Sequence, residues 1–81
     1  MRLIEMKPGE TGYVISLNGL DQAVAKKMLD LGMTKGERVS FIQRAPLGDP
    51  IWIELKGYQL AFRADIAKHI TIELKKGRGA E

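Results

Sequence analysis

The sequence predicts a mainly β fold: a small closed barrel of about five strands, with one α-helix after the first strand and a short helical turn before the last. Three observations predict it. Short segments in which apolar and polar residues alternate recur along the chain, and glycine or proline turn signals separate them. Only one segment has the apolar period of an amphipathic helix. Strands this short favour a bent barrel, because closure removes free sheet edges.

A change in the spacing of apolar residues distinguishes the first predicted strand from the predicted helix. Residues 13–17 alternate as a strand does, and the turn signal Asn18-Gly19 ends them. Residues 21–31 instead repeat their apolar side chains at i, i+4 and i+7, at Val24, Met28 and Leu31. We expect the Asp21 carboxylate to cap this helix and Gly32 to end it, with Met33 folded back onto Met28.

The rest of the chain predicts four more strands and one helical turn. Alternation predicts strands over residues 38–45, 51–55, 58–62 and 70–74. Lys56-Gly57 is typical of a tight hairpin turn, and residues 63–68 have room for one helical turn. This order of elements favours an SH3-like barrel over its alternative, an open antiparallel α+β sheet.

Length and composition favour a small binding module over an enzyme. The chain has 81 residues, no cysteine and one histidine. We expect one domain over residues 1–75, followed by a flexible basic tail over 76–81. No phosphate-binding glycine loop and no arrangement typical of a catalytic triad is present in the sequence. We therefore predict that the protein is not an enzyme.

Charge and hydropathy limit the partners and the location. The net charge is +3, but three basic residues and one acidic residue lie within 75–81, so the remaining body is nearly neutral. That distribution does not favour nucleic acid, because a nucleic-acid-binding module needs a basic face. The sequence has no apolar run of about 20 residues and no signal peptide. We expect a cytoplasmic protein that is not embedded in the membrane.

Three residues are candidates for contact with a protein partner. Leu47 lies in a loop between two prolines, Pro46 and Pro50, so a stiff loop presents an apolar side chain. Alternation places Trp52 outside the barrel core, and exposed tryptophans are enriched at interfaces. Arg63 either bonds loop carbonyls or projects as an anchor. The alternatives are a loop that only fixes the strand register and a Trp52 covered by other parts of the chain.

A weak metal site is the one cofactor possibility that the residues leave open. Asp65 and His69 are four residues apart and would share a face of a helical turn, where they could hold a divalent transition metal ion. The alternative is that Asp65 caps the short turn and His69 is a surface residue at the start of a strand.

The order of motifs is similar to that of a known family. The segments that carry the similarity are residues 7–12, 29–36, 44–51 and 60–63, within a match that runs over about residues 3–74. The chain resembles the FeoA family, the small cytoplasmic component of bacterial and archaeal ferrous iron uptake systems. It departs from the common pattern at Lys35, where proline is frequent, and at Phe62, where leucine is frequent.

The resemblance implies a fold, a partner and a role. The fold is an SH3-like barrel related to the C-terminal domain of metalloregulators of the diphtheria-toxin-repressor type. The partner is the membrane ferrous-iron permease, which has a cytosolic GTP-binding domain and would bring the protein to the membrane. The role is regulation of transport or of the nucleotide cycle, in a family described as binding transition metals. The alternatives are a stand-alone metal-sensing module and a nucleic-acid-binding KOW-type module. Assembly of copies through an exposed strand edge is left open.

Overall fold

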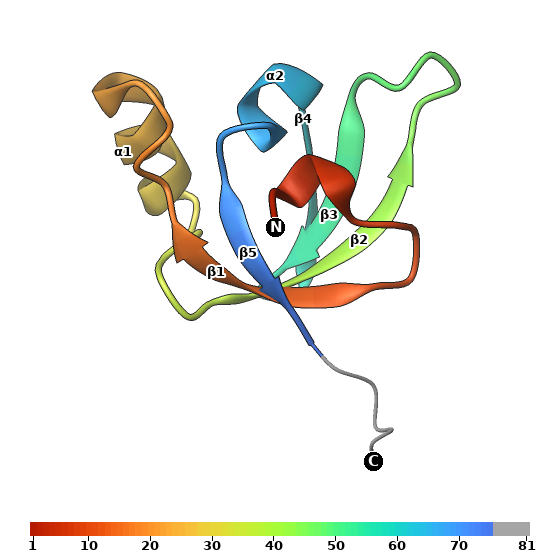
Figure 1. Cartoon of the computed structure of the whole chain (residues 1–81), viewed down its shortest axis with the longest axis horizontal. Helices are drawn as coiled ribbons and strands as arrows, with labels where there is room; N and C mark the ends of the chain where they lie inside the picture. Colours follow the sequence, from red (N-terminus) through yellow and green to blue (C-terminus); the bar gives the residue numbers. More distant parts are fainter. Residues whose placement is uncertain (76–81) are drawn as a thin grey trace.

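The computed structural model describes residues 1–75 as one strongly curved antiparallel sheet with three short helices (Figure 1). The strand order across the sheet is β4-β3-β2-β1-β5. The strands are β1 Thr11–Ser16, β2 Arg38–Arg44, β3 Ile51–Leu55, β4 Tyr58–Phe62 and β5 Thr71–Leu74. The helices are the 3₁₀ helix η1 Leu3–Glu5, α1 Gln22–Asp30 and α2 Ala64–Ala67. The predicted tail, residues 76–81, lies outside the described residues.

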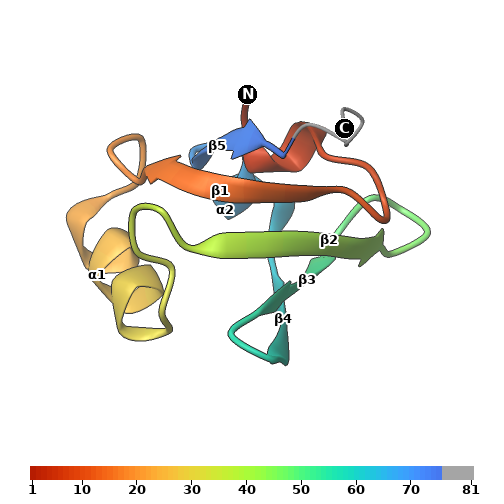
Figure 2. The same ribbon diagram turned by 90° about the horizontal axis from the view of Figure 1, so that it is seen from below.

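The predicted mainly β fold class is confirmed. The expectation that closure removes free edges is wrong, because β4 and β5 are the two edges of the sheet and do not pair with each other. Five antiparallel strands form one sheet, α1 follows the first strand and α2 precedes the last. Figure 2 shows β1 and β2 running side by side. β3 pairs with β2 along its whole length, and β4 lies beyond β3 at the edge of the sheet. Lys56 and Gly57 both have positive φ, as a two-residue hairpin turn requires.

A β-bulge changes the alternation predicted for β2. The β2–β3 register shifts between Phe41 and Gln43, so two residues of β2 stand opposite one residue of β3. Val39 and Phe41 face the core, whereas Gln43 is exposed. A second irregularity lies in β1, between Val14 and Ser16, where β1 pairs with β5.

The two ends of α1 differ in how well the sequence predicts them. At the C-terminus, Gly32 has φ +104°, and the Met33 N–H donates to the Met28 carbonyl at 3.0 Å. Both methionines are buried, so the predicted ending is confirmed. At the N-terminus the expectation is wrong. Asp21 occupies the N-cap position, but its carboxylate makes no capping hydrogen bond.

The core is apolar throughout the described residues. Its buried side chains are Leu3, Met6, Val14, Met28, Met33, Val39, Phe41, Ile51, Ile53, Leu55, Ala67, Ile70 and Ile72. Helix α1 contributes only Met28 as a buried residue, whereas the N-terminal segment contributes Leu3 and Met6, both with 0% exposure. The helix therefore shares the closing of the core with an N-terminal segment for which the sequence predicts no element.

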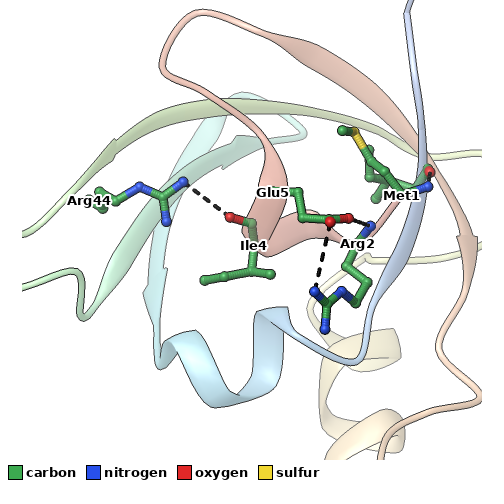
Figure 3. A network of polar contacts seen from close by, with 6 residues as sticks. Met1, Arg2, Ile4, Glu5 and Arg44 are labelled. Atoms are coloured by element: carbon green, nitrogen blue, oxygen red, sulfur yellow. Dashed lines mark hydrogen bonds and ion pairs between the residues drawn. The ribbon is translucent and has the colours of Figure 1, made fainter.

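Backbone pairing and one arginine hold this N-terminal segment in place. The Leu3 N–H donates to the Ile70 carbonyl, and the Ile72 N–H donates to the Met1 carbonyl, each at 2.8 Å, so residues 1–3 pair with the outer edge of β5. Arg44 Nη2 donates to the Ile4 carbonyl at 3.1 Å (Figure 3). The same nitrogen donates to the Met6 carbonyl at 2.8 Å. The same guanidinium lies 4.8 Å from the centre of the Phe41 ring.

Candidate docking surface

The loop between β2 and β3 presents Leu47 to solvent. The Ala45 N–H donates to the Pro50 carbonyl at 2.9 Å, and the Gly48 N–H donates to the Ala45 carbonyl at 2.7 Å. Gly48 has φ +90°, a conformation that glycine adopts without steric cost. The Leu47 side chain is 97% exposed. The loop is thus internally hydrogen-bonded and carries an apolar side chain that packs on nothing.

The same loop is bonded to the start of α2. Asp49 Oδ1 accepts a hydrogen bond from the Ala64 N–H at 3.0 Å, which satisfies one of the free N–H groups of the helix. The alternative in which Asp65 caps this helix is therefore wrong, because Asp49 supplies the cap from 15 residues earlier in the chain. Residue types alone do not reveal this link, because the two segments meet only in the folded barrel.

Trp52 and Arg63 lie at the same end of the barrel as the loop. Trp52 is half-buried between Gln43 of β2 and Ala61 of β4, on the side of β3 that faces away from the core. Arg63 follows Ala61 by two residues in extended backbone, which places the two on the same face. Arg63 is exposed, and its guanidinium makes no hydrogen bond or ion pair with residues 1–75. The carbonyl-bonding alternative considered for Arg63 is instead the role of Arg44.

We define the docking surface as Leu47, Trp52 and Arg63. These residues come from the β2–β3 loop, the start of β3 and the end of β4, which lie at one end of the sheet because Ile51 pairs with both Arg44 and Phe62. Their role in binding stays a prediction. The surface combines an exposed leucine, a tryptophan and an arginine without an ion-pair partner among residues 1–75. These residue types suit protein binding rather than catalysis.

The two predicted metal ligands lie next to this surface. Asp65 lies in α2, and His69 lies two residues beyond the end of that helix; both are exposed. Within residues 1–75, no group of three or more His, Cys, Asp or Glu side chains is placed to hold a metal ion. Zinc sites in proteins use three or four protein ligands. The described residues therefore do not fit a complete zinc site.

A second apolar surface was not predicted as a site. A hollow of about 570 Å³ lies between β1 and α1, and Ile15, Ala25 and Leu29 are among the residues lining it. Ile15 and Leu29 are 38% and 47% exposed. Alternation with buried Val14 could have indicated that Ile15 faces outward.

Comparison with known proteins gives a consistent result. A model of the FeoA domain matches residues 1–74. An Fe(2+) transport protein A/Fe(2+) transporter FeoB fusion protein of Porphyromonas gingivalis is 30% identical over 74 residues. That match covers 91% of the chain and 9% of the fusion protein, so the chain spans less than a tenth of this relative.

Solved structures agree with the family match. The FeoA protein of Chlorobium tepidum is 35% identical, with a TM-score of 0.89 over 95% of this chain and 72% of that one. The FeoA of Stenotrophomonas maltophilia, complexed with zinc and described as a prokaryotic SH3 domain protein, is 28% identical. Its TM-score is 0.79, over 90% of this chain and 89% of that one. The predicted SH3-like fold is thereby confirmed.

A manganese-dependent transcriptional repressor shares the fold alone. It is 19% identical, with a TM-score of 0.79 over 91% of this chain and 36% of that one. The predicted likeness to a domain of metalloregulators is confirmed at the level of the fold. Among the described helices, none has the length and apolar character needed to cross a membrane.

Proposed function

Because the chain belongs to the FeoA family, whose members are associated with ferrous iron transport, we propose that it is a cytoplasmic regulatory protein that docks on the permease. Its target is the cytosolic GTP-binding region of the membrane ferrous-iron permease. The observation that carries this proposal is the Porphyromonas gingivalis relative, in which transport protein A and the transporter FeoB form one chain. A fusion keeps two modules at high effective concentration, which suits modules that act together.

The docking surface has the physical properties that a binding site needs. Leu47 is almost fully exposed, so covering it with a partner would gain about 1.5–3 kcal/mol from burial of its side chain. Trp52 and Arg63 are residue types that dominate binding energy at interfaces. The Ala45–Pro50 and Asp49–Ala64 hydrogen bonds restrain the loop. Because the loop is already ordered, it loses less conformational entropy when a partner binds.

The role is regulation through contact, without catalysis by this chain. His69 is the one imidazole and there is no cysteine in the sequence, so the common nucleophile and base pairs are not available. In this proposal, contact with the permease brings the protein to the membrane. Nucleic acid is not among the proposed partners.

The test is a binding measurement with the purified cytosolic region of the permease. We expect Leu47→Asp and Trp52→Ala each to weaken the affinity by about tenfold or more, ~1.4 kcal/mol. Leu29→Asp is the matched control, because it places the same charge on an exposed leucine of the other apolar surface. Loss of binding in Leu29→Asp alone would place the site between β1 and α1. No binding by the parent protein would refute the partner.

Weak metal binding is a second candidate function. The zinc complex of the Stenotrophomonas maltophilia protein motivates it, and Asp65 and His69 are the candidate ligands. Titration with ferrous iron, manganese or zinc, followed by Trp52 fluorescence and the His69 ring signal, tests it. If Asp65→Ala and His69→Ala leave the metal affinity unchanged, these two residues are not the ligands.

A further inference from the structure

One outer edge of the sheet has a backbone partner within the described chain, and the other has none. The outer edge of β5 is covered, because residues 1–3 pair with it through the Leu3–Ile70 and Ile72–Met1 hydrogen bonds. The outer edge of β4 is bare. Among residues 1–75, no backbone hydrogen bond joins β4 to any segment other than β3. β4 is the edge strand on the far side of β3 from β2.

The register of the hairpin identifies the free backbone groups. Leu55 and Tyr58 flank the two-residue turn and therefore form a hydrogen-bonded pair. Hydrogen-bonded and non-hydrogen-bonded pairs alternate along antiparallel strands. Gln59 and Ala61 fall at non-hydrogen-bonded positions, so their N–H and C=O groups point away from β3. Both residues are exposed.

β4 lacks the features that usually protect an edge. Natural proteins blunt such edges with lysine or another charge, with proline, or with a bulge. The segment Tyr58-Gln59-Leu60-Ala61-Phe62 contains no charged residue and no proline. Its pairing with β3 runs without a bulge. A short, regular and uncharged edge is a template for another strand.

We propose that β4 pairs antiparallel with β4 of a second copy of this chain, with the two Leu60 residues opposite each other. This register sets Gln59 of each copy opposite Ala61 of the other. Each of these two pairs exchanges both of its N–H···O bonds, so every free polar group of Gln59 and Ala61 is satisfied. The same register sets Tyr58 opposite Phe62, an aromatic cross-strand pair, and brings no like charges together.

The pairing would join the outer faces of the two sheets. Trp52 is the cross-strand neighbour of Ala61, and Glu54 is that of Gln59. Across the joined sheets, one row of neighbouring side chains would run from Trp52 to Ala61 of one copy. It would then run to Gln59 and Glu54 of the other copy. The docking surface would thus gain polar neighbours from the second copy. An edge of five residues buries little area, so we expect a weak dimer, with a Kd of about 0.1–1 mM.

A concentration series of the isolated chain tests the pairing without the permease, so its outcome is independent of the proposed function. We expect the amide NMR signals of Gln59 and Ala61 to shift, and their hydrogen exchange to slow, as the concentration rises to about 1 mM. Sedimentation equilibrium should show a monomer and a dimer. No change over this range would overturn the proposal. Shifts confined to Ile15 and Leu29 would also overturn it.

Two substitutions at one position separate the backbone bond from the side chain. Ala61→Pro removes an N–H that faces away from β3, which an edge strand tolerates, and should weaken dimerisation at least tenfold. Ala61→Thr keeps the N–H and favours strands, so it should dimerise as the parent does. Equal dimerisation of both variants would overturn the proposal. If Ala61→Pro does not fold, the concentration-dependent exchange of the parent's Gln59 and Ala61 amides decides.

Discussion

Two short segments lie beside the end of β2: the N-terminal segment, residues 1–6, which contains η1, and the β2–β3 loop, residues 45–50. Each carries one leucine. Leu3 is fully buried, whereas Leu47 is 97% exposed. The N-terminal segment is hydrogen-bonded to β5 and to Arg44, whereas the loop is bonded mainly to itself. The same residue type therefore stabilises the fold in one segment and remains available to a partner in the other.

The strongest test of this difference removes each leucine in turn. Leu3→Ala should lower the free energy of unfolding by about 3 kcal/mol, because it removes a buried side chain and leaves a cavity. Leu47→Ala should change it by less than about 0.5 kcal/mol. Urea unfolding of the two variants and the parent measures both values. Similar costs for the two variants would remove the contrast between the segments.

The next test loosens the N-terminal segment without touching its apolar side chains. Arg44→Ala removes the donor for the Ile4 and Met6 carbonyls and the cation over Phe41. We expect a loss of about 2 kcal/mol, the usual cost for hydrogen bonds to a charged group. Arg44→Lys keeps the charge but not the planar guanidinium, so its cost should be smaller. A cost of Arg44→Ala near zero in urea unfolding would mean that burial of Leu3 and Met6 holds the segment by itself.

Local signals in the sequence predict most of the sheet. In β3, Ile51 and Ile53 face the core and Trp52 faces outward, as alternation requires. The turn at Lys56-Gly57 is likewise predictable, because two consecutive residues of suitable type decide it. These features depend on neighbours in the chain, so a short window of sequence contains the information.

The N-terminal segment could not be predicted in this way. Leu3 and Met6 are too few to show a period, and residues far away in the sequence, Arg44 and Ile70, supply hydrogen bonds that fix their segment. In the candidate site, too, one feature could be predicted from nearby residues and another could not. The prolines of the loop indicate that Leu47 is exposed, but the link from Asp49 to Ala64 exists only once the barrel has formed.

A smaller effect is expected from the one bond that ties the loop to α2. Asp49→Ala removes the carboxylate that caps the Ala64 N–H and should cost about 1 kcal/mol, as the loss of a helix cap does. Asp49→Asn keeps an oxygen acceptor at the same position and should cost less. Urea unfolding gives these values, and affinity for the permease region reports whether the bond also positions Leu47. Unchanged stability in Asp49→Ala would show that the loop is independent of α2.

The smallest expected effect returns to the N-terminal segment and depends on pH. The hydrogen bond from the Arg2 N–H, at 2.7 Å, lowers the pKa of Glu5, and the Arg2 guanidinium acts in the same direction. A carboxylate whose pKa is lowered by folding stabilises the folded state above its unfolded pKa. It loses that contribution as the pH falls through its folded pKa.

The stability difference between the parent and Glu5→Gln should therefore be constant near neutral pH. It should shrink as the pH falls from about 4.3, the ordinary pKa of glutamate, through the lowered pKa of Glu5. Urea unfolding at a series of pH values measures this difference, and the carboxyl carbon signal of Glu5 reports the pKa directly. Because Glu5 is exposed, the effect should be far smaller than that of Leu3→Ala. An equally large effect would mean that this surface pair, rather than the buried side chains, holds the segment against β5.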